Sequence, residues 1–426
     1  MFWCRRLLVG LRRNPARVLP FLWLLIPVAL GGYVGGRQLW ARHHFRAAER
    51  CLQGRQFAEA RAHLTRCLAV WPTDVKTHFL LARTARRAGD YQEAGQHLER
   101  CEQLHGATRD IALERLLARA QRGDLDPRAE NLLWSYVKED DPDSSLILEA
   151  LVQGYFHAYR LGEAITCLQR WLRREPDNVQ ALVWRGQAWE GLQDLPRAIA
   201  DYRAALERDP EHFDARLRLA QALINADQRL DEAVDHLNQL RQRQPRNAEV
   251  LRSLASCRSQ RGQGAEARAL LDEVLAEDPR DVAALRQRGK LAFEQGQAAA
   301  AQGWLRRALE VDAHDYETWF ALGQSLQQAG KEKEARQCLS RSEQIRADFQ
   351  HLRELAAKAG EKPTDPAPRY QAGMICLRNG QEQEALRWFN GALQVDPNYQ
   401  PARKALAEYS RRQANPAAQP PALSPE

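Results

Sequence analysis

The sequence has no large excess of charge of one sign. Its 62 Lys and Arg residues are interspersed with 55 Asp and Glu residues, which leaves a formal net charge of +7. A nucleic-acid-binding domain normally concentrates its basic residues on one face. We therefore expect no nucleic-acid partner, whereas acidic peptides and lipids stay compatible with the charge. With 44% hydrophobic and 27% charged residues, the composition is that of a globular protein.

Closely paired cysteines are also absent. The chain has eight cysteines, and no two of them form a CxxC pair. Separate thiols would be a liability in an oxidising compartment, so this pattern argues against exposure of the chain to one. We interpret seven of the cysteines as buried thiols at positions where small apolar side chains pack in helices: Cys51, Cys67, Cys101, Cys167, Cys257, Cys338 and Cys376.

The motifs that catalysis requires are missing as well. There is no Gly-rich phosphate loop, no HExxH zinc helix, no nucleophile elbow and no His/Cys cluster with metal-ligand spacing. His43 and His44 are adjacent and would point to different sides of a helix, which favours surface residues over a metal pair. We therefore expect no enzyme activity, no cofactor and no metal site.

Prolines recur at nearly constant spacing through the middle of the chain. The intervals between them are 34, 34, 35 and 34 residues. Proline ends one helix and lets the next begin, because it has no N–H and clashes with the preceding turn. A period near 34 indicates a solenoid of helical hairpins. The prolines are Pro142, Pro176, Pro210, Pro245 and Pro279.

Small residues recur in register with these prolines. If proline is counted as place 32, places 8 and 20 are small, as at Gly186 and Ala198 or at Gly289 and Ala301. Small side chains there would let two antiparallel helices approach closely. Glycines also recur after the first helix, where a left-handed residue is expected: Gly54, Gly89, Gly123, Gly162, Gly262, Gly296, Gly330 and Gly380.

This pattern of Leu, Gly, Tyr, Ala, an aromatic residue, Ala and Pro at fixed places resembles the tetratricopeptide repeat. The resemblance covers about residues 41–349 and 366–412. It implies an all-α fold, a right-handed α-solenoid of about ten helical hairpins, with a capping helix at about 400–412. The implied copies are 41–74, 75–108, 109–144, 145–178, 179–212, 213–247, 248–281, 282–315, 316–349 and 366–399.

The repeat pattern breaks near the C-terminus. A helical pattern continues through about residue 358 and is followed by a Pro-rich loop, so we expect the second helix of the ninth copy to be extended. Residues 343–365 are either a spacer between two sub-arrays or a docking arm. The Pro- and Ala-rich tail, residues 413–426, is predicted to be disordered.

The N-terminus holds a long apolar run. After a basic segment at 1–17, residues 18–36 contain 19 uncharged residues, which is long enough to cross a bilayer as a helix. We predict a single transmembrane helix here. A cleaved signal peptide and a buried core helix are the alternatives.

The flanking charges suggest an orientation for this predicted span. Five arginines precede it and four follow within a similar distance, which favours a cytoplasmic N-terminus with the repeats outside the cytoplasm. The cysteine pattern argues the other way. Overlapping pairs of glycines at 31–36 either let two spans pack together or form a Gly-rich exit from the helix.

In solenoids of this family, places 2, 5, 9 and 12 line a concave groove that binds peptides. These places carry a basic stripe with one aromatic residue in the second copy and a second basic patch further along, which either bind an acidic segment or carboxylate or are an ordinary solvated face. Family members that bind chaperone tails hold the terminal carboxylate with Asn at place 9. None of the copies has Asn there, so the resemblance does not extend to these adaptors. The groove candidates are Lys76, Phe79, Arg83, Arg86, Arg87, Phe156, Arg252, Arg286, Lys290, Phe320 and Tyr370.

Two functions follow from this reading. The first is a membrane-anchored scaffold that binds partner proteins or peptides in its groove and assembles an envelope-associated complex. The second is a secreted or periplasmic, non-catalytic subunit of a polysaccharide or secretion machine, whose leader has been removed.

Overall fold

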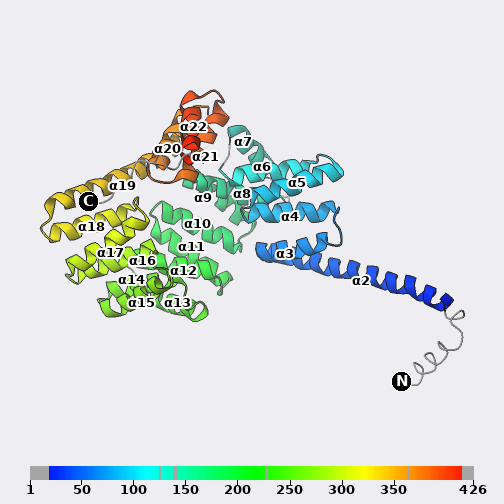
Figure 1. Ribbon diagram of the computed structural model, residues 1–426, viewed down its shortest axis with the longest axis horizontal. Helices are drawn as coiled ribbons and strands as arrows, with labels where there is room; N and C mark the ends of the chain where they lie inside the picture. Colours follow the sequence, from blue (N-terminus) through cyan, green and yellow to red (C-terminus); the bar gives the residue numbers. More distant parts are fainter. Residues whose placement is uncertain (1–18, 124–125, 138–142, 227–228, 363, 415–426) are drawn as a thin grey trace, which may run out of the picture. The chain divides into compact units, whose positions relative to one another are not determined.

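The computed structural model describes residues 19–123, 126–137, 143–226, 229–362 and 364–414. Side chains are described from residue 35 onward, except at 360–361 and 412–414. The basic segment 1–17 and residues 415–426 of the predicted tail lie outside this part of the chain. Within it, every regular element is an α-helix, as the sequence predicts (Figure 1). The chain divides into two compact units, residues 1–119 and residues 120–426.

Unit 1 contains the first two hairpins. In each, the two helices pack on one another, and α3 also packs on α4. Its helices are α2 (Leu19–Gln53), α3 (Phe57–Leu68), α4 (Val75–Arg87), α5 (Tyr91–His105) and the greater part of α6 (Arg109–Gln121).

Unit 2 continues the hairpins in chain order (Figure 1). The first helices α10, α12, α14, α16 and α18 also contact one another in turn, which places them along the inner side of a curved stack. The remaining helices are α7 (Pro127–Tyr136), α8 (Ser144–His157), α9 (Leu161–Arg174), α10 (Val179–Gly191), α11 (Leu195–Arg208), α12 (Phe213–Asn225), α13 (Leu230–Arg243), α14 (Ala248–Gln260), α15 (Gly264–Glu277), α16 (Val282–Glu294), α17 (Ala298–Val311), α18 (Tyr316–Gln328), α19 (Glu332–Glu361), α20 (Ala367–Arg378), α21 (Glu382–Val395) and α22 (Gln400–Ala414).

Capping residues explain where many of the first helices begin. At several of these helices the residue before the first turn is an Asp or Asn whose side chain accepts a hydrogen bond from a backbone N–H of that turn, as Asp74 does from Thr77 N at 2.8 Å. Such caps satisfy amides that have no partner within the helix. The same cap recurs at Asn178, Asn247, Asp281 and Asp315.

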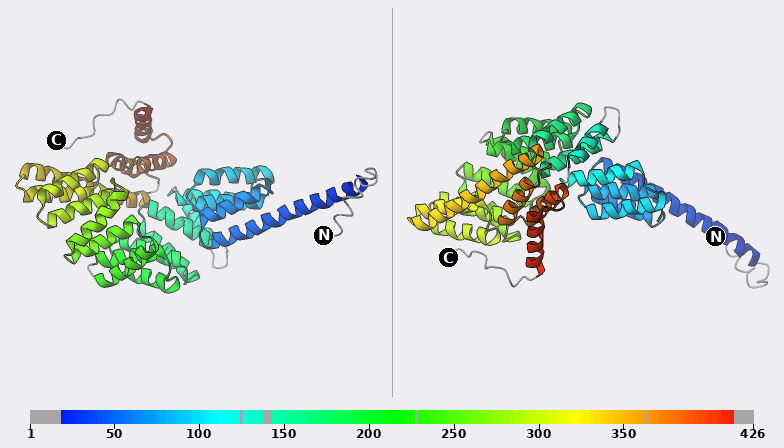
Figure 2. Two further views of the ribbon diagram at one scale, coloured as in Figure 1. Left: turned by 60° about the horizontal axis from the view of Figure 1, so that its bottom comes forward. Right: turned by 90° about the horizontal axis from the view of Figure 1, so that it is seen from above.

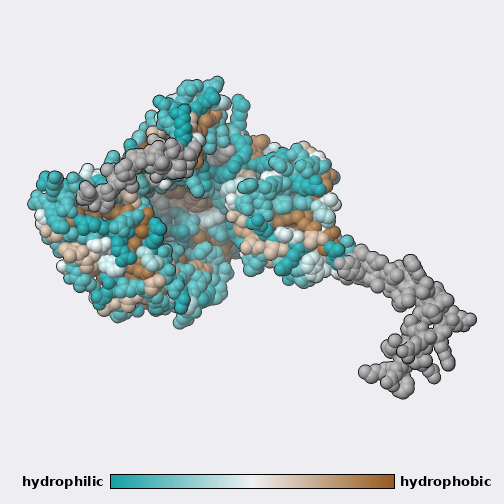
Figure 3. Space-filling model, viewed as in Figure 1, coloured by the Kyte–Doolittle hydropathy of each residue, from teal (hydrophilic) through white to brown (hydrophobic). Residues whose placement is uncertain are grey.

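Glycine at place 8 allows the two helices of a hairpin to touch. A Cβ atom added to Gly289 would lie 2.6 Å from Leu305 Cγ, and one added to Gly323 would lie 2.7 Å from Leu339 Cγ. The prediction of close helix approach at this place is confirmed. The apolar stripes are buried between the helices, and the visible face of the described residues is mostly hydrophilic with small apolar patches (Figure 3).

The prediction that these turn glycines adopt a left-handed conformation is only partly correct. Gly89, Gly123, Gly262, Gly296, Gly330 and Gly380 have positive φ, as expected. Gly54 does not, and the left-handed residue is its neighbour Arg55. Gly162 lies inside α9, and Tyr159 takes the left-handed conformation instead. The position at which each helix ends decides which residue adopts this conformation.

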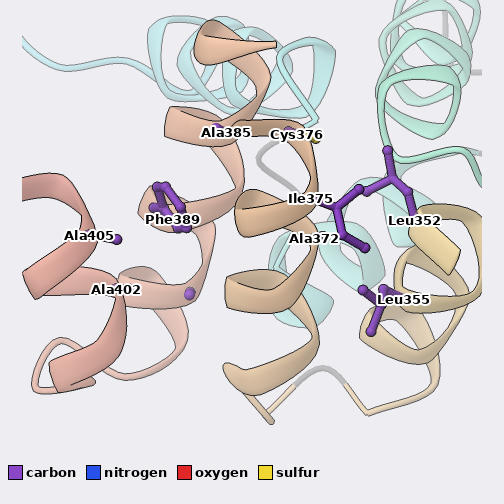
Figure 4. Packing of buried hydrophobic residues seen from close by; sticks show 10 residues of the cluster. Leu352, Leu355, Ala372, Ile375, Cys376, Ala385, Phe389, Ala402 and Ala405 are labelled. Atoms are coloured by element: carbon purple, nitrogen blue, oxygen red, sulfur yellow. The ribbon is translucent and has the colours of Figure 1, made fainter. Parts of the chain in front are cut away.

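The long helix α19 joins two hydrophobic clusters of unit 2. It spans 30 residues and ends at Glu361, where the sequence places the end at about residue 358. Its first half contributes Ala335 and Cys338 to the cluster around α18. Its second half contributes Leu352 and Leu355 to the cluster of the last hairpin, where they lie beside Ile375 (Figure 4). The capping helix α22 follows and ends at Ala414, inside the segment 413–426 that the sequence predicts to be disordered.

The predicted span, residues 18–36, falls mostly on the first half of α2. Residue 18 and the side chains of residues 19–34 lie outside the described part of the chain. Among the residues that the structure does describe, no helix is both long and apolar enough to cross a membrane. α2 runs without interruption from Leu19 to Gln53, so that the first helix of hairpin 1 is the end of a longer helix (Figure 2).

Candidate functional site

The predicted basic stripe lies on α4, and much of its charge is already neutralised. Arg83 Nε lies 2.5 Å and Arg86 Nε 2.6 Å from the two carboxylate oxygens of Glu114. Arg86 is 1% exposed, so its guanidinium belongs to the interior and not to the groove surface. Burial raises the pKa of Glu114, but the charges of Arg86 and Arg83 outweigh it and leave the pKa below its ordinary value.

The other members of the stripe make local contacts. The Arg87 guanidinium lies 4.8 Å from the Phe57 ring centroid, and that of Arg83 lies 5.1 Å from the Phe79 ring centroid. Lys76 is exposed, with Nζ 3.4 Å from Glu49 Oε1. Of the five residues predicted on this helix, Lys76 is therefore the one whose charge is best placed to meet a ligand.

The second predicted patch joins successive hairpins of unit 2. Arg252 Nη1 lies 2.7 Å from both carboxylate oxygens of Asp281, the cap of α16. Arg286 repeats this contact one hairpin later with Asp315, the cap of α18. Because each arginine bonds to the cap that follows, these residues connect neighbouring repeats. Lys290 lies at the same interface, 3.8 Å from Glu317.

The predicted aromatic groove residues are not equivalent. Phe320 is exposed on α18, and Phe156 is half-buried on α8. Tyr370 packs against Phe389 and Tyr399, with both pairs of ring centroids 5.9 Å apart, and so contributes to the core of the last hairpin. Phe320 is thus the predicted aromatic residue of unit 2 that is most accessible to a partner.

A pocket lies in unit 1 among the described residues, and the groove places predicted from the sequence include only one of its lining residues, Lys76. Its volume is about 690 Å³, and it opens between α2, the loop 69–74 and the start of α4. We call it the unit 1 pocket. Its lining residues are Arg42, Phe45, Arg46, Glu49, Val70, Trp71, Pro72, Thr73, Asp74 and Lys76.

Two half-buried aromatic rings form part of the wall of the unit 1 pocket. The ring centroids of Phe45 and Trp71 are 6.4 Å apart. Trp71 Nε1 donates a hydrogen bond of 2.6 Å to Gln38 Oε1, which fixes the indole. Lys76 Nζ lies 4.7 Å from the centroid of the Phe45 ring. This wall offers apolar area that is already held in place before a ligand arrives.

The unit 1 pocket carries a local excess of positive charge. Glu49 is paired with Lys76, and Asp74 accepts hydrogen bonds from Thr77. In the described part of the chain, the guanidinium groups of Arg42 and Arg46 have no carboxylate within ion-pair distance, and both residues are exposed. Two available guanidinium groups next to an aromatic wall suit a carboxylate-bearing ligand with an apolar side chain.

The sequence contained a signal for this pocket. Arg42, Phe45 and Glu49 occupy places 2, 5 and 9 of the first copy, and Lys76 occupies place 2 of the second. The same groove places that predict the basic stripe of the second copy therefore also mark this pocket in the first. Trp71 lies in the turn between the two copies, where no groove rule applies.

A smaller pocket of about 470 Å³ lies in unit 2 between the end of α6 and α21. Arg122, Arg387, Asn390 and Gln394 are among its lining residues. It has no aromatic wall, and Arg387 is already paired with Glu384 at 2.6 Å. The described residues hold no group of three or more His, Cys, Asp or Glu side chains that could bind a metal ion. The unit 1 pocket is therefore the better candidate for a binding site.

Comparison with known families agrees with this fold. Models of the tetratricopeptide repeat match residues 45–105, 150–212, 191–248 and 286–348, and further models of the same repeat match 225–289 and 368–399. Together they cover more than half of the chain. The protein belongs to the tetratricopeptide repeat family, a class of helical scaffolds that bind proteins and peptides.

Individual relatives match only in part. Tetratricopeptide repeat protein 14 of Mus musculus is 36% identical over 84 residues, which are 20% of this chain and 11% of that protein. MamA residues 41 to the end, from Desulfovibrio magneticus RS-1, is 20% identical with a TM-score of 0.36, covering 40% of this chain and 95% of MamA. A tetratricopeptide repeat protein from Parabacteroides merdae ATCC 43184 is 18% identical with a TM-score of 0.38, covering 68% of this chain and 99% of that one. These structural likenesses concern the fold alone.

Proposed function

We propose that this protein is a non-catalytic scaffold that binds a partner polypeptide in the unit 1 pocket. The partner segment is acidic and carries an aromatic or aliphatic side chain. The observation that carries the proposal is the combination of the Phe45–Trp71 wall with the guanidinium groups of Arg42 and Arg46. The carboxylates of the segment would pair with the arginines, and its apolar side chain would contact the wall.

The proposed scaffold is held at a membrane through residues 18–36 and assembles an envelope-associated complex there. The support for this part is the uncharged run in the sequence. In the proposed topology the chain crosses the membrane once, with the N-terminus in the cytoplasm and the repeats outside, and two spans can self-associate. Membrane fractionation tests it. An intact N-terminus that stays in the pellet after a carbonate wash supports the anchor, whereas soluble protein that begins near residue 32 supports a removed leader.

Binding to the unit 1 pocket is tested with a defined peptide. The probe is Asp-Asp-Leu-Asp-Asp-Phe with a rhodamine label, and its affinity for the full-length protein is measured by fluorescence anisotropy. The double variant R42E/R46E should bind about tenfold more weakly or worse, which corresponds to about 1.4 kcal/mol. R173E/R280E makes the same change of net charge at two exposed arginines of unit 2 and should leave the affinity unchanged.

Two further peptides separate the charge from the apolar side chain. Lys-Lys-Leu-Lys-Lys-Phe should not bind, since its charge is reversed. Asp-Asp-Ser-Asp-Asp-Ser should bind more weakly than the probe, because it lacks the side chains that contact Phe45 and Trp71. Equal binding of the probe to wild type and R42E/R46E would reject the pocket as the site.

A further inference from the structure

Two pairs of histidines lie beside the unit 1 pocket, at the same place in hairpins 1 and 2. His44 Nδ1 is 2.7 Å from His63 Nδ1, and His78 Nδ1 is 3.0 Å from His97 Nδ1. Within each pair the two residues are 19 apart in sequence, and the second pair follows the first by 34 residues. Each pair therefore joins the first helix of its hairpin to the second.

Such a contact requires at least one neutral ring. Two imidazole nitrogens can share a hydrogen bond only if one carries the proton and the other offers a lone pair. A doubly protonated pair has two N–H groups that face each other and two positive charges. A pair in which at least one ring is neutral can form the N–H···N hydrogen bond. A pair in which both rings are protonated cannot form it.

The second pair is linked to a residue that lines the pocket. His78 Nε2 lies 3.1 Å from the carbonyl oxygen of Pro72. Because a carbonyl can only accept, His78 Nε2 carries the proton and its Nδ1 accepts from the Nδ1–H of His97. This chain of hydrogen bonds fastens the loop 69–74 to α4 and α5.

The first pair holds the opposite wall of the pocket. His44 precedes Phe45 on α2, and its ring lies edge-on to Trp40 with centroids 4.4 Å apart. The bond to His63 connects α2 with α3. Both sides of the Phe45–Trp71 wall thus depend on a histidine pair.

The charged groups around the pairs are mostly basic. His44 faces His43 of α2 and His63 and Arg66 of α3, and burial followed by the charges of His63 and Arg66 lowers its pKa. His97 faces Arg61 of α3, His78 of α4 and Glu93 of its own helix, with Nε2 3.9 Å from Glu93 Oε1.

Burial, followed by the charges of His78 and Arg61, lowers the pKa of His97. Glu93 offers little compensation, because it is paired with Arg61 at 3.0 Å. On α6, Arg115 is paired with Glu102 at 2.5 Å. Both pairs therefore lie in surroundings that oppose additional positive charge.

We propose that the two histidine pairs make the unit 1 pocket sensitive to protons, so that mildly acidic pH loosens its walls and releases the ligand. The inference rests on the proposed function, since it concerns the regulation of that pocket. Because the pKa values of His44 and His97 lie below the ordinary histidine value of 6.5, these two rings are neutral above that pH. As the pH falls through 6.5 towards the lowered pKa values of His44 and His97, these rings take up protons, and the N···N bond of a pair breaks once both of its rings carry a positive charge.

The direction in which peptide affinity changes with pH distinguishes loosening of the pocket from attraction between charged histidines and the peptide. The aspartates of the probe Asp-Asp-Leu-Asp-Asp-Phe stay ionised between pH 5.5 and 7.5. Extra positive charge on histidines would by itself attract this peptide more strongly in acid. Loosening of the pocket predicts the opposite, a weaker complex at low pH.

The experiment measures the affinity of the full-length protein for the rhodamine-labelled probe at pH 7.5 and 5.5, with EDTA present to remove metal ions. The affinity of wild type for the probe should be lower at pH 5.5 than at pH 7.5 by a factor of about five or more. In H63N/H97N an amide replaces one ring of each pair and can donate to or accept from the remaining histidine, so its affinity should change little with pH. The control H105N/H351N removes two exposed histidines and should keep the wild-type dependence. If H63N/H97N does not bind at pH 7.5, the single variants are measured, and each should lose part of the pH effect.

Hydrogen exchange of residues 69–76 gives a readout that needs no ligand. After correction for the intrinsic pH dependence of exchange, wild type should lose protection there at pH 5.5, and H63N/H97N should not. A peptide that fails to bind at any pH rejects the proposed function, while the exchange data still decide the inference. Equal protection at both pH values, or tighter binding of the peptide in acid, overturns the inference.

Discussion

Gly186 on α10 lies directly against the ring of Tyr202 on α11. A Cβ atom built on Gly186 would be 2.5 Å from Tyr202 Cε1. The ring cannot easily move aside, because the Tyr202 hydroxyl donates a hydrogen bond of 2.6 Å to Glu190 Oε2. The same relationship recurs between Gly373 and Phe389 in the last hairpin, also at 2.5 Å.

Gly186→Ala should therefore destabilise the protein. The added methyl group overlaps Tyr202 and forces the two helices apart, an effect of about 1–3 kcal/mol. Chemical denaturation followed by circular dichroism measures the loss. Gly303→Ala is the matched control, since Gly303 is exposed inside α17 and has nothing within 4 Å of the added Cβ. That change should stabilise the helix by about 0.5–1 kcal/mol. Equal effects of the two changes would contradict the packing argument.

Arg252 and Asp281 should be energetically coupled in the stability of the protein. R252A removes the Nη1 group that donates to both carboxylate oxygens of the cap of α16, whereas D281N keeps a good capping side chain but removes its charge. A double-mutant cycle should give a coupling energy of about 0.5–2 kcal/mol. Denaturant titrations of the two single variants and the double variant measure it. If both residues served a ligand instead, the cycle would show no coupling in stability and peptide binding would change.

Removing the charge of Glu114 should weaken unit 1. Glu114→Gln takes away the carboxylate that faces the guanidinium groups of Arg83 and Arg86, and the loss should be about 3 kcal/mol or more. The pKa of Glu114 is lowered in the folded chain, so its stabilisation is complete above its ordinary value of 4.5 and disappears as the pH falls through the folded value. Thermal unfolding between pH 3 and 7 should show a larger acid-dependent loss in wild type than in E114Q. Glu99→Gln, at an exposed position on α5, should change neither quantity.

The cysteines should differ in their reactivity. Burial and then the charge of Asp74 raise the pKa of Cys67 and of Cys101 to about 11, whereas Cys51 is only half-buried. The thiolate is the reactive form. N-ethylmaleimide at pH 7.5 should therefore modify Cys51 well before Cys67 or Cys101 in the native protein, and all three at similar rates in denaturant. Peptide mass spectrometry over a time course gives the three rates, and rapid native labelling of Cys67 would contradict the burial.

Much of the fold could be predicted because its causes are local. Each proline ends a helix within its own turn, and the small residue at place 8 acts on the helix that follows it in the same hairpin. Both signals are therefore present within one period of about 34 residues. The prediction fails at Gly54 and Gly162 because the end of a helix can shift by a few residues, and Arg55 and Tyr159 then adopt the left-handed conformation despite their side chains.

The candidate site was harder to predict because the charges of the groove residues that the sequence singles out are neutralised across repeats. The partner of Arg86 is Glu114, 28 residues away, and the partner of Arg252 is Asp281, 29 residues away. A basic stripe on one helix is therefore not evidence of free positive charge when the next repeat places a carboxylate opposite it. Arg42 and Arg46 have no such partner in the described part of the chain, and only the contacts between helices distinguish them from the paired arginines.

The 30-residue helix α19 has a mechanical consequence. At 1.5 Å per residue it is about 45 Å long, and it is shared by two hydrophobic clusters that would otherwise be separate. If a flexible linker joined the two clusters, the last hairpin could move or unfold independently. Because α19 is one continuous helix, the backbone hydrogen bonds of α19 must break before the two clusters can separate. A force applied to the C-terminal hairpin is therefore transmitted through α19 to the cluster around α18, which makes this end of the protein mechanically rigid.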